Sequence, residues 1–140
     1  MYLSDIDFKV LFICKENSIR SIMAEAILNK LSDGKIKAVS AGLNGNHDIH
    51  PLTKKILMQE GFSVNQLHSK KLEPELLAQT DFVVTVCDVS SCVMLNNLDP
   101  KTTLFKWDIA EPHTGRENDF STTFKVIQNR CLEFLSILPV

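Results

Sequence analysis

The stretch FKVLFICKENSIRSIMAEAILNKL, residues 8–31, predicts how the chain begins to fold. Residues 8–14 form an apolar run of β-branched and aromatic side chains, which is typical of a buried strand. From residue 21 to residue 31 apolar side chains recur at helical spacing, and Gly34 stops the pattern. A predicted strand therefore passes through one short, glycine-free segment, CKENSIRS, directly into a predicted helix.

The alternation of strand and helix continues to the end of the chain. The apolar patterns predict further strands at 35–41, 81–87 and 102–108, and further helices at 51–60, from about Pro74, and at 121–138. Strands that alternate with helices imply right-handed crossovers and a parallel sheet covered on both faces. We therefore expect one three-layer α/β domain over residues 1–140, with a four-stranded parallel sheet and helices on both faces.

Composition and charge indicate which kinds of binding partner and which cellular location to expect. A net charge of -2 gives no overall attraction to nucleic acid or to an anionic membrane, so we expect neither as a partner. The apolar runs are shorter than the roughly 20 residues that a membrane helix needs. The first residues, MYLSDIDFK, carry acids where a secretory signal would be basic, so we expect a cytoplasmic protein. The four cysteines are then better explained as thiols than as a disulfide framework.

The predicted strands end in side chains that can do chemistry. Residues at or just past their carboxyl ends are Cys14, Ser40, Cys87 and Asp108. In a sheet of this kind, ligands bind outside the carboxyl ends of the strands. The sequence therefore predicts a site at this edge of the sheet.

The 14–21 segment has the properties of a site for a tetrahedral anion. A loop that enters a helix points several backbone N–H groups at one place, where the helix dipole adds positive charge. Arg20 adds a fixed, two-point positive group, and these influences favour the thiolate form of Cys14, which makes it a nucleophile. Ser18 or Ser21 can hydrogen-bond the sulfur. The alternative is a cysteine packed as a small apolar side chain, with Arg20 simply solvated.

Three motifs in order carry a family resemblance. Cys-x5-Arg-Ser, Met-Ala-Glu at 23–25 and Ser-Ala-Gly at 40–42 together resemble the low-molecular-weight protein tyrosine phosphatases and the arsenate reductases that share their fold. The resemblance runs from about residue 8 to the last predicted helix. It implies that Cys14 is the nucleophile and that the substrate is a small oxyanion, phosphate or arsenate, or a phosphotyrosine protein. It also implies that the substrate-binding residues are Lys15, Glu16, Asn17, Ser18, Ile19, Arg20 and Ser21.

The segment also departs from the phosphatase pattern. Glu16 stands where the phosphatases usually have glycine, and Ile19 stands where they have a second cysteine. The pair Lys15-Glu16 is more similar to arsenate reductases that use glutathione or glutaredoxin. A glutamate that turned into the loop would repel an anion, so we expect the Glu16 side chain to project outward at the rim.

A second pair of cysteines favours the reductase over the phosphatase. In DFVVTVCDVSSC, Cys87 follows the third predicted strand and Cys92 comes five residues later. Reductases of this fold have a cysteine after that strand, whereas the phosphatases typically do not. The resemblance implies that Cys87 attacks the Cys14 adduct and that Cys92 resolves the resulting disulfide by exchange. Two buried structural cysteines are the alternative, and a zinc site is a weaker one because no histidine has matching spacing.

The general acid is expected after the fourth predicted strand. The family has an acidic residue before a proline there, which places Glu111 in that register and leaves Asp108 as the second candidate. The family's phosphatases have tyrosines after this proline, whereas this chain has His113 and Thr114, which argues against a phosphotyrosine substrate. Surface positions are expected for His47, His50 and His68, and a core position for Cys131.

The resemblance finally suggests a cation and redox partners. Thioredoxin-coupled reductases hold a potassium ion with residues that match Asn17, Glu25 and Ser40, so potassium is possible here. The alternative is a helix glutamate that bonds the loop backbone. No other cofactor is expected, and thioredoxin or glutaredoxin would supply electrons. Three hypotheses stay open: an arsenate reductase, a phosphatase, and a non-catalytic oxyanion-binding module.

Overall fold

The sheet is four-stranded and parallel, as predicted. The computed structural model of the protein describes residues 8–44, 48–87 and 92–138. Its strands are Phe8–Cys14 (β1), Ile36–Gly42 (β2), Phe82–Thr85 (β3) and Thr103–Lys106 (β4). They lie in the order β2-β1-β3-β4, and each pair of neighbours runs parallel. Every carboxyl end therefore reaches the same edge of the sheet, where the sequence predicts the site.

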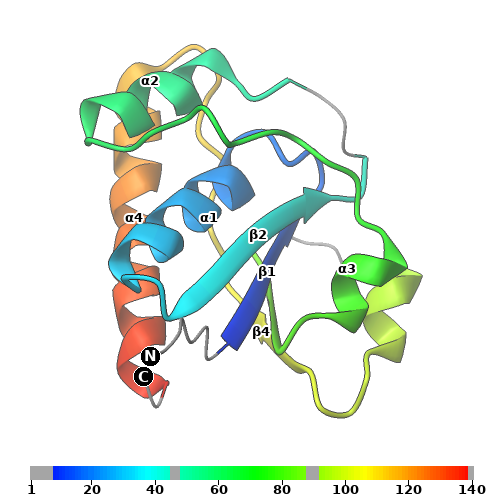
Figure 1. Cartoon of the computed structure of the whole chain (residues 1–140). Helices are drawn as coiled ribbons and strands as arrows, with labels where there is room; N and C mark the ends of the chain where they lie inside the picture. Colours follow the sequence, from blue (N-terminus) through cyan, green and yellow to red (C-terminus); the bar gives the residue numbers. More distant parts are fainter. Residues whose placement is uncertain (1–7, 45–47, 88–91, 139–140) are drawn as a thin grey trace.

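Helices cover both faces of the sheet (Figure 1). The helical segments of the described chain are Arg20–Leu31 (α1), Pro51–Gln59 (α2), Pro74–Ala78 (α3), the 3-10 turn Val93–Asn97 (η1) and Glu117–Ile137 (α4). The helices α1, α2 and α4 pack together over one face, and α3 with η1 covers the other. The predicted three-layer α/β architecture is correct.

Several element boundaries differ from the prediction. The strands β3 and β4 are shorter than 81–87 and 102–108, and α4 begins at Glu117 rather than at residue 121. The first turn of α4 carries Glu117 and Asp119, whose charges suit the positive end of the helix but do not belong to its apolar stripe. The 3-10 turn η1 was not predicted, because five residues are too few to show a periodic pattern.

The central strand fixes the position of the site. Val10, Leu11, Phe12 and Ile13 of β1 have no exposed surface, since one face of the strand packs under α1 and the other under α3 and η1. Cys14 is the last residue of this strand and is itself buried. Cys14 is therefore held at the end of a strand that is buried on both faces. None of the helices in the described ranges is both long enough and apolar enough to span a bilayer.

Candidate active site

The 14–21 segment turns tightly because two residues allow it. Asn17 has a left-handed backbone with φ of 53°, a conformation that asparagine tolerates better than most residues. Gly42, at the end of β2, lies directly against the segment. A Cβ atom on Gly42 would come within 2.7 Å of the Lys15 carbonyl oxygen and 2.8 Å of the Asn17 nitrogen. The turn and the glycine together let β2 and the segment pack backbone to backbone.

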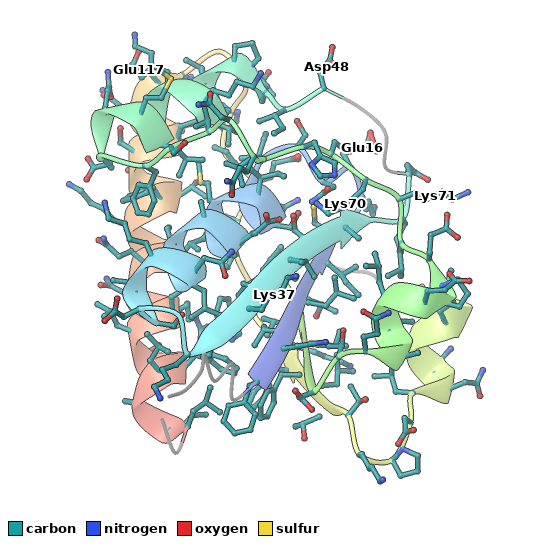
Figure 2. The ribbon with its side chains drawn as sticks, viewed as in Figure 1. Glu16, Lys37, Asp48, Lys70, Lys71 and Glu117 are labelled. Atoms are coloured by element: carbon teal, nitrogen blue, oxygen red, sulfur yellow. The ribbon has the colours of Figure 1, made fainter. Side chains whose placement is uncertain are left out.

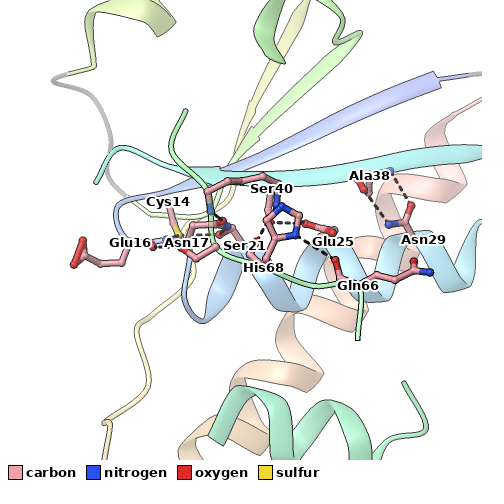
Figure 3. Close-up of polar contacts among 12 residues, drawn as sticks. Cys14, Glu16, Asn17, Ser21, Glu25, Asn29, Ala38, Ser40, Gln66 and His68 are labelled. Carbon is pink, nitrogen blue, oxygen red and sulfur yellow. Dashed lines mark hydrogen bonds and ion pairs between the residues drawn. The ribbon is translucent and has the colours of Figure 1, made fainter. Parts of the chain in front are cut away.

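Hydrogen bonds converge on the sulfur of Cys14 (Figure 3). The Asn17 backbone N–H donates to Cys14 Sγ at 3.1 Å, and Ser21 Oγ lies 2.9 Å from the same sulfur. Asn17 Nδ2 donates to Ser21 Oγ at 2.8 Å, which leaves the Ser21 hydroxyl proton free to point at the sulfur. These contacts hold the sulfur of Cys14 in one position at the start of the segment.

The segment is held from outside by two other parts of the chain. The Lys70 backbone N–H donates to Asn17 Oδ1 at 2.8 Å. On the other side, the His50 N–H donates to Ser18 Oγ at 3.1 Å, and Thr53 Oγ1 donates to the Ser18 carbonyl at 3.2 Å. The segment is therefore anchored to the start of α2 and to the chain that precedes α3.

A pocket of about 700 Å³ opens at the segment. It is lined by Cys14, Lys15, Glu16, Ser18, Ile19, Arg20, Asn44, His50, Cys87, Glu111 and Thr114. Of the residues predicted to bind substrate, Asn17 and Ser21 are fully buried and support the pocket without lining it. Asp108 and Cys92 are not part of its wall.

Arg20 and the acid Glu111 lie close together in the lining of the pocket. Arg20 Nη1 donates to the Ile109 carbonyl oxygen at 2.8 Å, and Arg20 Nη2 lies 3.8 Å from Glu111 Oε1. The side chain of Glu111 is 63% exposed, so it can reach a ligand or turn to solvent. Asp108 faces solvent because it lies between the buried residues Trp107 and Ile109 on extended chain. The geometry thus favours Glu111 over Asp108 as the group able to deliver a proton.

Cys87 shares the pocket with Cys14. Burial raises the pKa of the Cys87 thiol, and the negative charge of the nearby Cys14 raises it further, whereas Arg20 and Lys15 lower it. Cys92 is buried at the start of η1, and all four cysteines are free thiols. The structure thus brings Cys87, but not Cys92, into the pocket that Cys14 lines. The intervening residues, 88–91, lie outside the described chain.

The side chain of Glu16 projects away from the sulfur. It is exposed, and its Oε2 accepts a hydrogen bond from Asn44 Nδ2 at 3.4 Å. Figure 3 shows it pointing outward from Cys14. Ile19, the other departure from the phosphatase pattern, is buried and belongs to the core under α1. The outward direction is the one that the sequence analysis expected for Glu16.

His50 was predicted at the surface, and in the structure it is half-buried at the start of α2. Its Nδ1 accepts the Leu52 N–H at 3.1 Å, so the ring caps α2, and the ring lies 4.8 Å from that of Phe120. A neutral ring with Nδ1 as acceptor carries its proton on Nε2. The position directly before Pro51 at a helix start was the available signal. His68 is exposed as predicted, and His47 lies outside the described residues.

A comparison with protein families identifies the chain. Residues 9–139 match the model of the family described as low molecular weight phosphotyrosine protein phosphatase. The chain belongs to this family. The match spans almost the whole described structure, including the 14–21 segment and the other residues that line the pocket.

Members of the family that resemble this chain carry two kinds of activity in their names. One relative is the low molecular weight protein-tyrosine-phosphatase YfkJ of Bacillus subtilis, 38% identical over 85 residues, which are 55% of this chain and 54% of that protein. Another is the glutaredoxin arsenate reductase of Synechocystis, 34% identical over 79 residues, which are 56% of this chain and 60% of that protein. The chain thus spans little more than half the length of these relatives.

A solved structure extends the likeness to nearly the whole chain. It is the thioredoxin-dependent arsenate reductase of Corynebacterium glutamicum, with a TM-score of 0.80 and 25% identity. The match covers 96% of this chain and 63% of that protein. The family, as these matches represent it, includes both phosphatases and arsenate reductases.

Glu25 and Ser40, two of the residues expected from the resemblance to hold a potassium ion, are hydrogen-bonded to each other, and Glu25 is also paired with Lys70. Ser40 Oγ donates to Glu25 Oε1 at 2.6 Å, and Lys70 Nζ lies 3.6 Å from the same oxygen. The carboxylate is therefore already paired with an ammonium group. Within the described ranges no cluster of three or more His, Cys, Asp or Glu residues could hold a metal ion. Cys131 is buried in the core as predicted, and burial raises its pKa to about 12.

Proposed function

We propose that this protein is a thiol-dependent arsenate reductase. The observation that carries the proposal is the presence of two thiols, Cys14 and Cys87, in the wall of one pocket beside Arg20. A phosphatase of this fold needs only the first thiol, because water completes its reaction. A reductase needs a second thiol to take the electrons of the reaction away from the first. Arsenate reductases among the relatives support the proposal.

The first step is attack on the oxyanion. Arsenate lies over the 14–21 segment, where backbone N–H groups and Arg20 bind its oxygens. The Cys14 thiolate forms a bond to arsenic. One arsenic-bound hydroxyl takes a proton from Glu111 and leaves as water. Arsenic is still As(V) in this adduct.

The second step moves two electrons. Cys87 loses its proton to solvent, and its sulfur attacks the sulfur of Cys14. The sulfur–arsenic bond breaks and its electron pair stays on arsenic, which leaves as As(III) arsenite. The two thiols are oxidised to a Cys14–Cys87 disulfide. Burial and the negative charge of Cys14 raise the pKa of Cys87, whereas Arg20 and Lys15 lower it, so these two basic residues help to supply the Cys87 thiolate.

The third step restores the thiols with an external dithiol. Thioredoxin, or glutaredoxin with glutathione, reduces the disulfide and is itself oxidised. Cys92 can take part as follows: its sulfur attacks the sulfur of Cys87, a Cys87–Cys92 disulfide forms, and Cys14 is released as a thiolate. This exchange needs movement of the chain, since Cys92 is buried.

Arsenite production by purified variants tests the proposal. Wild-type protein supplied with arsenate should form arsenite with thioredoxin or with glutathione and glutaredoxin. Cys87→Ser should lose at least about a hundredfold of this activity, because no thiol remains to release arsenite. Cys131→Ala is the matched control, since Cys131 is buried away from the pocket, and it should keep the activity. Undiminished arsenite production by Cys87→Ser, or none by wild type with either donor, would refute the reductase.

A phosphatase is the second candidate, and one observation favours it. Glu111 lies beside Arg20 at the pocket, where it could protonate the leaving oxygen of a phosphoester. Hydrolysis of an aryl phosphate that survives Cys87→Ser but not Cys14→Ser would select this function. Tight sulfate binding with neither activity would select a non-catalytic module.

A further inference from the structure

Glu25 is a largely buried carboxylate close to the residues around Cys14. It lies on α1, one helical turn after Ser21, and its side chain is only 12% exposed. Residues four apart lie on the same face of a helix, so Glu25 is stacked behind the residue that touches the Cys14 sulfur. A negative charge at this place opposes both a thiolate and a bound oxyanion, unless another group compensates it.

Lys70 provides the compensating charge. Its Nζ lies 3.6 Å from Glu25 Oε1, and the Lys70 side chain is 22% exposed, so both partners are largely withdrawn from water. The same Nζ donates to the His68 carbonyl oxygen at 3.0 Å. Figure 2 shows Lys70 beside the end of β2, next to its neighbour Lys71, whose side chain is exposed.

The backbone of Lys70 also reaches the nucleophile. Its N–H donates to Asn17 Oδ1 at 2.8 Å, and the amide of Asn17 donates to Ser21 Oγ at 2.8 Å. Ser21 Oγ in turn lies 2.9 Å from Cys14 Sγ. The Gly42 N–H donates to the Lys70 carbonyl at 2.9 Å and so fixes this residue on the end of β2. One residue thus joins the buried acid to the groups that orient the sulfur.

We propose that Lys70 is a positioning residue whose ammonium group is a built-in cation for the oxyanion site. It compensates Glu25 and holds the hydrogen bond to Asn17 in place, so the site works without a bound potassium ion. The inference rests on the proposed oxyanion site. It does not depend on whether the reaction is reduction or hydrolysis, because a reductase and a phosphatase both begin by binding an anion at Cys14. The test therefore measures anion binding rather than turnover.

The experiment compares Lys70→Ala with Lys71→Ala, which removes an exposed lysine next to it. The phosphate affinity is measured as protection of Cys14 against iodoacetamide, read by mass spectrometry. Solutions contain potassium or tetramethylammonium chloride at one ionic strength, which keeps screening constant. Wild type and Lys71→Ala should show equal affinity in both salts. Lys70→Ala should bind phosphate about tenfold more weakly in tetramethylammonium, the usual effect of losing a charged hydrogen-bonding partner.

Potassium should restore much of this loss in Lys70→Ala, because the vacated place beside Glu25 and Ser40 then suits a small cation. Lys70→Arg should keep the wild-type behaviour in both salts. The double variant Glu25→Gln/Lys70→Ala, which buries no unpaired charge, should fold even where the single variant does not, and should show no preference between the salts. The proposal would be overturned by a potassium requirement in wild type, by unchanged affinity in Lys70→Ala, by a loss that potassium does not relieve, or by a potassium preference in the double variant.

Discussion

Arg20 donates a 2.8 Å hydrogen bond to the carbonyl oxygen of Ile109, which lies 89 residues later in the chain. This bond joins the start of α1 to the segment that follows β4, and it places Glu111 at 3.8 Å from the same guanidinium group. Arg20 Nη1 is thus held by a hydrogen bond within the protein. This bond sets the orientation of the whole guanidinium group before an anion binds. The geometry of the pocket depends on a planar group with several donors.

Replacing Arg20 with lysine should therefore abolish most anion binding without unfolding the protein. An ammonium group cannot bond the Ile109 carbonyl and also contact an oxyanion at two points. We expect a loss of about a hundredfold in phosphate affinity, with a thermal unfolding midpoint close to that of wild type. Near-native affinity in Arg20→Lys would mean that the anion binds elsewhere.

Gly42 should be as necessary as any charged residue of the site. A methyl group at this position would overlap backbone atoms of Lys15, Glu16 and Asn17, which cannot move away as a flexible side chain could. Gly42→Ala should destabilise the fold by about 1–3 kcal/mol and weaken phosphate binding, because the 14–21 segment must shift. Gly115→Ala is the control, since a Cβ there meets nothing within 4 Å. Equal effects of the two substitutions on binding would contradict this account.

The reactivity of Cys87 should depend on the charge of Cys14. The pKa of Cys87 is raised first by burial and next by the negative charge of Cys14. Cys14→Ser removes the second cause and keeps the first, so the pKa of Cys87 should fall but stay above that of a free thiol. Alkylation of Cys87 by iodoacetamide, followed by mass spectrometry, should therefore reach its midpoint at lower pH in Cys14→Ser than in wild type. Coincident pH profiles would show that the two sulfurs are not coupled.

Glu111 and Asp108 can be separated by removing one carboxylate at a time. Glu111→Gln should lower the rate of the first chemical step about a hundredfold, because the pocket carboxyl group that lies 3.8 Å from Arg20 can no longer donate a proton. Asp108→Asn, at an exposed position outside the pocket wall, should change that rate by less than about threefold. Single-turnover kinetics with either substrate class measures the step. A larger effect of Asp108→Asn would reverse the assignment.

The sequence was sufficient to predict the elements that carry the site. Apolar periodicity located β1 and α1, and the parallel sheet that follows from alternation placed Cys14 and Cys87 at one edge. These features are local, because the repeat of apolar side chains that predicts a strand or a helix lies within that element. Asp108 was harder to place, since β4 ends at Lys106 and the buried pair Trp107 and Ile109 turns the residue between them outward.

The hydrogen bonds that hold the 14–21 segment from other parts of the chain could not be predicted from the sequence. Lys70 bonds Asn17 across 53 residues and His50 bonds Ser18 across 32, and no local pattern records which loops return to the site. His50 was missed for the further reason that a histidine in a polar stretch resembles a solvated one. The proline that follows His50 was the one sequence signal of its place at a helix start, whereas its contact with Phe120 appears only in the folded structure.

Glu16 provides the last prediction, since its charge lies on the segment that we propose binds the anion. A carboxylate turned into the pocket, about 6 Å from the anion, would cost about 3 kcal/mol at an effective dielectric constant of about 20. The exposed side chain instead accepts a hydrogen bond from Asn44 at the rim, where water screens its charge.

We therefore expect Glu16→Gly and Glu16→Gln to change phosphate affinity by less than about twofold, with the same dependence on salt as wild type. The two variants separate charge from backbone freedom, because glutamine removes only the charge, whereas glycine also loosens the turn before Asn17. Titration calorimetry at low and high salt measures both quantities. A gain of tenfold or more in both variants that shrinks as salt is raised would show that the carboxylate turns inward in solution and repels the anion. Such a result would also weaken the case for catalysis, because a carboxylate that faces the anion lowers the affinity of the pocket for its substrate.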